Sequence, residues 1–81
     1  MADATADLKQ LAIDVQTMQT MISANDAAIQ AEIAEIRAGV ASMNRDVIGT
    51  SCDHISFVST ESAQSAASVS AEANAMVAGL P

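Results

Sequence analysis

The chain has 81 residues, one Phe as its sole aromatic residue, and ten acidic side chains against three basic ones, for a formal net charge of −7. So few large side chains cannot form a hydrophobic core within a single chain, and we expect a homo-oligomer rather than a compact monomer. The acidic balance excludes binding to nucleic-acid phosphates and disfavours anionic membrane surfaces.

Residues 1–48 are predicted to form one long coiled-coil helix, because they are rich in Ala, Gln, Glu, Met and Leu. Apolar side chains recur there at alternating spacings of three and four, as a coiled-coil seam requires. The predicted oligomer core consists of Leu8, Leu11, Val15, Met18, Ile22, Ile29, Ile33, Ile36, Val40, Met43 and Val47.

The seam contains a predicted stutter. Heptads run from Leu8 to Ile22 and again from Ile33 to Val47, and the step between them is eleven residues, which locally unwinds a left-handed supercoil. Asn25 and Asp26 interrupt the apolar stripe at this point. Either they form a polar layer that fixes the register or holds water or an ion, or their side chains turn to solvent. Both readings stay open.

A break is predicted at residues 49–51, where helix propensity falls, and a second helix is expected within residues 52–81. Its predicted end is near residue 78, because Gly79 and Pro81 follow. The second seam is rich in Ser and Ala, and we expect it to be the weaker half or to order only on a partner. It comprises Cys52, Ile55, Ser59, Ser62, Ala66, Val69, Ala73, Met76 and Leu80.

The seam residues also bear on oligomeric state and direction. Ile33 and Ile36 occupy successive core positions, which favours a trimer over a dimer. Glu32 and Arg37 have the g-to-e spacing by which neighbouring chains pair charges in a parallel coil. The expected fold is therefore all-α, a parallel homotrimeric coiled coil followed by a shorter Ala/Ser-rich helix.

Cys52, Asp53 and His54 form the one cluster that resembles a chemical site. Neighbours on a helix point about 100° apart, and further zinc ligands at motif spacing are absent, so we predict no catalytic residue, metal or cofactor. Cys52 is instead predicted to lie near the same residue of a neighbouring chain. The sequence also shows neither a phosphate loop nor a Ser-His-Asp pattern, and an enzyme is not expected.

The sequence indicates synthesis in the cytoplasm without export. The N-terminus MADATAD carries acids where a secretory signal has Lys or Arg, and an apolar segment does not follow it. The chain contains no run of eighteen uncharged apolar residues, so a membrane span is excluded.

Two segments resemble known coiled-coil families. LKQLAIDVQTMQ looks like the heptads of short trimeric outer-membrane lipoproteins, although their lipidated Cys and basic C-terminus are missing. SAQSAASVSAEANA is similar in style to the Ala/Ser-rich stretches of fibre and fibritin-like proteins of tailed bacteriophages. The second resemblance implies a virion structural protein.

We therefore expect a non-enzymatic structural protein that forms a fibre, spike or connector of a larger particle such as a phage virion. Its partners would be copies of itself and other structural proteins of the particle. The alternative is a cytoplasmic adaptor, in which the second helix folds back along the first and a partner helix binds in the groove between them.

Overall fold

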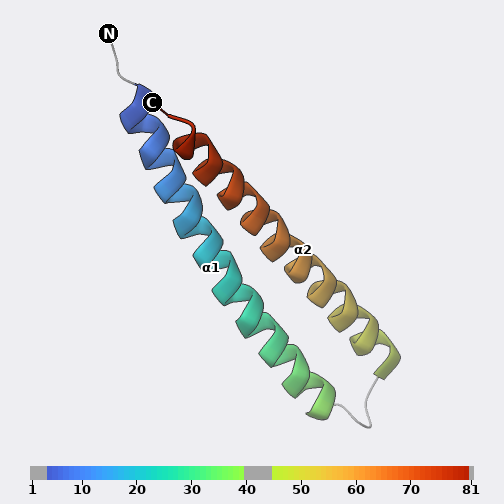
Figure 1. Ribbon diagram of the computed structural model, residues 1–81. Helices are drawn as coiled ribbons and strands as arrows, with labels where there is room; N and C mark the ends of the chain where they lie inside the picture. The colour runs from blue at the N-terminus through green and yellow to red at the C-terminus, as the bar shows by residue number, and fades with distance from the viewer. Residues whose placement is uncertain (1–3, 40–44, 81) are drawn as a thin grey trace.

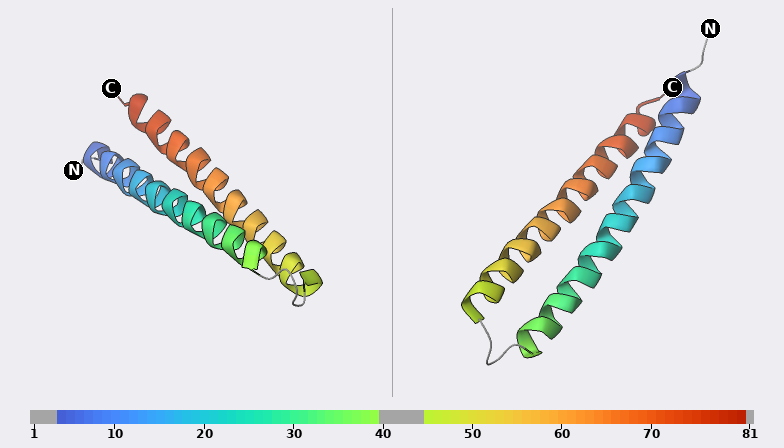
Figure 2. Two further views of the ribbon diagram at one scale, coloured as in Figure 1. Left: turned by 90° about the horizontal axis from the view of Figure 1, so that it is seen from below. Right: turned by 180° about the vertical axis from the view of Figure 1, so that it is seen from behind.

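The computed structural model of the protein describes residues 4–39 and 45–80. Two antiparallel helices, α1 (Ala4–Gly39) and α2 (Arg45–Ala78), form a hairpin (Figure 1). Two further views show the helices side by side along their length, with the last residues of α2 near the start of α1 (Figure 2). The hairpin is slender, with extents of 65 × 18 × 14 Å. The predicted all-α class is confirmed within the described residues, and the helices pack as a hairpin.

The helix ends carry the expected charges and hydrogen bonds. Asp7 lies in the first turn of α1 and Arg37 in its last turn, where each side chain opposes the charge of the helix dipole. At the end of α2, the amide of Gly79 donates to the carbonyl of Ala75 at 3.1 Å, and that of Leu80 donates to Val77 at 3.1 Å. These bonds satisfy carbonyls that the last helical turn leaves without partners.

The boundary between the helices differs from the predicted one. α1 ends at Gly39, and residues 49–51, where we predicted the break, lie within α2. The low helix propensity of Gly49 is overridden because α2 packs along α1 over its length. Val40 and Met43 of the predicted core lie outside the described residues.

The two helices meet through mostly small side chains. The residues with the least exposure, at 4 to 7%, are Ala12, Ile33, Cys52, Ala66, Ser70 and Ala73. Together with half-buried neighbours they recur at three and four residues along both helices, the spacing of an antiparallel coiled-coil contact. On α1 these positions are Thr5, Leu8, Ala12, Val15, Gln19, Ile22, Asp26, Ile29 and Ile33. On α2 they are Gly49, Cys52, Ser56, Ser59, Ala63, Ala66, Ser70, Ala73, Val77 and Leu80.

The predicted core on α1 is therefore divided between two surfaces. Its members that pack against α2 are Leu8, Val15, Ile22, Ile29 and Ile33. Leu11, Met18 and Ile36 are 50%, 43% and 42% exposed, and Val47 at the start of α2 is 68% exposed. The predicted seam follows the largest apolar side chains, such as Leu11 and Met18. The contact with α2 instead uses Ala12, Gln19 and Asp26. Ala12 and Gln19 each lie one residue after a member of the predicted seam.

The α1 residues that contact α2 follow a heptad spacing without interruption from residue 5 to residue 33. Asp26 fills the contact position at which the apolar stripe of the sequence is interrupted. The predicted stutter belongs to a seam between chains and stays a prediction, as do the trimer and the parallel direction of its chains.

Candidate functional site

An open apolar groove runs between the two helices on one flank of the hairpin. It consists of two adjoining hollows of about 420 Å³ and 480 Å³ that share Ile22, Val58 and Ser62. The first hollow is also lined by Met18, Phe57, Glu61, Ser65, Ala66 and Val69. The second is also lined by Asn25, Asp26, Ile29, His54, Ile55 and Ser59.

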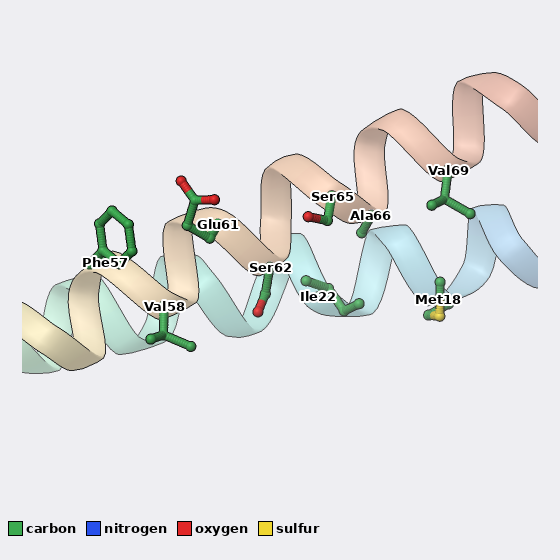
Figure 3. A pocket seen from close by; sticks show the side chains of 9 residues that line it. All are labelled: Met18, Ile22, Phe57, Val58, Glu61, Ser62, Ser65, Ala66 and Val69. Carbon is green, nitrogen blue, oxygen red and sulfur yellow. The ribbon is translucent and has the colours of Figure 1, made fainter.

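The close-up of the first hollow separates its floor from its rim (Figure 3). Val58, Ser62 and Val69 of α2 point down in this view, towards the level of Ile22 and Met18 on α1. Phe57 and Glu61, one turn apart on α2, point up and away from α1. Phe57 is 63% exposed, although it has the largest apolar side chain of the protein.

Exposed apolar side chains extend the groove beyond the two hollows. On α1, Leu11 lies seven residues before Met18, so both occupy one row of the helix. On α2, Val69 and Met76 continue the row of Ile55, and all three are between 38% and 52% exposed. Soluble monomers seldom expose contiguous apolar surface of this kind, which marks interaction sites.

A network of polar side chains connects the two helices beside the second hollow, which Asp26 and Ser59 of the network line. The Ser59 hydroxyl donates to the Asp26 carboxylate at 2.7 Å, and the Gln30 amide donates to the same carboxylate at 3.1 Å. The Ser56 hydroxyl donates to the Gln30 side-chain oxygen at 2.7 Å, and the Gln30 amide also lies 3.2 Å from the Ser56 carbonyl. The Ser59 hydroxyl, followed by the Gln30 amide, lowers the pKa of Asp26. The bonds made by Ser59 and Ser56 join α1 to α2 and oppose sliding of one helix past the other, whereas the bond between Gln30 and Asp26 lies within α1.

The predicted interruption at Asn25 and Asp26 thus contains two different environments. Asp26 is half-buried and bonded to α2, which suits the register-fixing reading within one chain. Asn25 is exposed and lines the groove.

The opposite flank of the hairpin carries the described basic side chains. Arg37 donates to Asp53 at 2.6 Å, and the two side chains are 51% and 73% exposed, so the pair contributes about 0 to 1 kcal/mol. Lys9 lies in the same α1 row as Arg37, because the two are four heptads apart, and it lines a smaller hollow of about 310 Å³ with Asn74. The predicted partner of Arg37 in another chain, Glu32, is exposed, and that interchain pair stays a prediction.

The structure separates the three residues of the Cys52, Asp53 and His54 cluster. The free thiol of Cys52 is buried at 5% exposure, Asp53 binds Arg37, and His54 lines the groove. Nowhere in residues 4–39 and 45–80 do three or more His, Cys, Asp or Glu residues gather as metal ligands would. The contact of Cys52 with a second chain stays a prediction, and its burial between the helices of one chain shields it from such contact.

Several groove residues were missed at the sequence level. Val58 and Phe57 lie outside the predicted seam, and Gln30 was not singled out although it binds across the hairpin. A signal existed for Val58, which lies three residues after Ile55 and four before Ser62 and therefore shares their helix face. The pairing of Gln30 with Ser56 had no such signal, because it depends on how the helices fold back.

Comparison with known proteins leaves the groove as the main guide to function. No protein-family model, curated protein or solved structure matches the chain. None of the helices in the described part of the chain is long and apolar enough to span a membrane.

Proposed function

We propose that the protein is a non-enzymatic interaction module whose hairpin binds an amphipathic helix of a partner protein in the open groove. The observation that carries this proposal is the continuous apolar flank, from Leu11 and Met18 on α1 to Ile55, Val58 and Val69 on α2. A third helix would extend the two-helix packing and remove these side chains from water.

The exposed side chains offer enough apolar surface for such binding. Full burial of a Val, Leu, Ile or Met side chain is worth about 1.5 to 3 kcal/mol, and each of these five residues is now 43 to 52% exposed. Covering the exposed halves would supply on the order of 5 kcal/mol in total, before the cost of association. That magnitude suits a reversible interaction rather than a permanent one.

Binding of a synthetic amphipathic helical peptide tests the proposal. The variant Ile55→Ser/Val58→Ser should weaken binding by about tenfold or more, because it makes the groove polar. The matched control is Ile13→Ser, since Ile13 is 57% exposed but lines the hollow on the opposite flank. Equal losses for both variants, with the hairpin still helical by circular dichroism, would contradict a groove-binding function.

A second candidate is a homo-oligomeric structural protein, such as a connector of a phage virion. It is favoured by Leu11, Met18 and Ile36, which belong to the predicted oligomer core and are exposed in a single hairpin. Copies of the chain could bury them in a bundle of hairpins. Sedimentation equilibrium tests this candidate, because it requires a mass of at least twice the 8.3 kDa of one chain at micromolar concentration.

A further inference from the structure

The described charged side chains along the apolar groove are all acidic. Asp14 lies three residues after Leu11 and four before Met18, and Glu72 lies in the same way between Val69 and Met76. Residues at these spacings share a helix face, so both acids border the groove.

Two further acids border the groove by other observations. Glu61 lines the first hollow directly and rises from its rim (Figure 3). Glu32 continues the α1 row of Met18 and Asn25. All four bordering carboxylates are on exposed residues and are open to a partner.

The described basic side chains lie on the other flank. Arg37 is paired with Asp53, and Lys9 lines the smaller hollow with Asn74. Among the residues whose side chains are described, neither Lys nor Arg lines either hollow of the groove. The groove therefore joins an apolar floor to an acidic border, while Arg37 and Lys9 lie where a helix bound in the groove would not meet them.

We infer that the partner helix is basic, with an apolar stripe flanked by Lys or Arg; this inference rests on the groove-binding function proposed above. Such a helix would bury its stripe on Ile22, Val58 and Val69 while its cations approach the acidic borders. A second copy of the chain fits less well, because it would bring a net charge of −7 and the same acidic borders against this one.

Three peptides of equal length and identical apolar stripe separate charge from hydrophobic binding. Their flanking positions carry Lys, Gln or Glu, and their affinities for the full chain are measured by fluorescence anisotropy. We expect the Lys peptide to bind about tenfold or more tightly than the Gln peptide at about 0.02 M salt, and the Glu peptide to bind most weakly. The advantage of Lys should shrink at about 0.5 M salt, because exposed charges are then screened.

Two variants with equal net charge locate the effect. Glu61→Gln/Glu72→Gln neutralises two acids of the groove border, whereas Asp46→Asn/Asp53→Asn neutralises two exposed acids that line neither hollow. The first variant should lose most of the preference for Lys over Gln. The second should keep it, although both change the total charge by the same amount.

The outcomes distinguish the inference from the function on which it rests. If all three peptides bind equally at low salt, the basic partner is refuted while groove binding stands. If the Lys preference survives in Glu61→Gln/Glu72→Gln and falls in the control, the cation site lies elsewhere and the inference is also refuted. If none of the peptides binds a folded hairpin, both the groove-binding function and the basic partner are refuted. If the chain self-associates and this blocks peptide binding, the occupant of the groove is a second copy of the chain.

Discussion

Ile33 and Ile36 give the sharpest test of the hairpin. They are the same residue type less than one turn apart on α1, yet Ile33 is 7% exposed and Ile36 is 42% exposed. A parallel oligomer that buries both side chains in its core predicts similar losses when either is truncated to Ala. The hairpin alone predicts unequal losses.

The expected magnitudes follow from burial. Truncation of a packed Ile to Ala costs about 2 to 5 kcal/mol, and the lower part of that range applies here because two helices leave no large side chain fully buried. We expect Ile33→Ala to lower the free energy of unfolding by about 2 to 3 kcal/mol. Ile36→Ala should lower it by about 1 kcal/mol or less, because it removes a half-exposed side chain that fills no closed space.

Urea denaturation followed by circular dichroism measures both values, and it should be repeated over a range of protein concentrations. A monomeric hairpin has a midpoint that does not change with concentration, whereas an oligomer becomes more stable as concentration rises. Equal losses for the two variants, together with a concentration-dependent midpoint, would refute the assignment of Ile36 to an open surface.

Three further predictions concern other positions. Gly49→Ala should raise the free energy of unfolding by about 1 kcal/mol in the same denaturation assay, because Ala is the better helix former and a Cβ at this position meets nothing within 4 Å. A lower free energy of unfolding would show that residues 49–51 are not helical in solution. The pKa of Asp26 is lowered in the folded chain, so the stabilisation that its carboxylate provides is complete at neutral pH and is lost as the pH falls below about 4 and through the folded-state pKa. Asp26→Asn should flatten this part of a plot of unfolding free energy against pH. An unchanged plot would contradict the hydrogen bonds from Ser59 and Gln30 to Asp26. The Cys52 thiol should react slowly with a thiol reagent in the native chain and quickly in urea, and rapid native reaction, or a disulfide-linked dimer after mild oxidation, would contradict its burial between α1 and α2.

Much of the helical structure was predictable from local chemistry. The Ala, Gln, Glu and Leu content of residues 4–39 favours helix at every turn, and Gly79 marks the end of α2 because glycine is common just beyond a helix. Periodicity also placed Leu8, Ile22 and Ile29 on one stripe, and these residues do pack in the hairpin.

The sequence also contained most of the candidate site, but under a different interpretation. Leu11 and Met18 belong to the first predicted seam, and Ile55 and Val69 belong to the second. Periodicity reports which residues share a face, and it does not report what covers that face. Some residues of each predicted seam, such as Met18 and Val69, therefore line the groove and lie outside the helix contact.

By itself, the sequence determined two long helices, their apolar rows and a strongly acidic surface, because these depend on local propensity, spacing and composition. Only the tertiary structure decided that α2 packs antiparallel along α1 and that the helices meet through small residues such as Ala12, Ala66 and Ala73. Small side chains give a weak hydrophobic signal, yet they let two helices approach closely. The close approach of the helices allows hydrogen bonds such as that from Ser59 to Asp26. It also separates the apolar flank with its acidic border from the flank that holds Arg37 and Lys9.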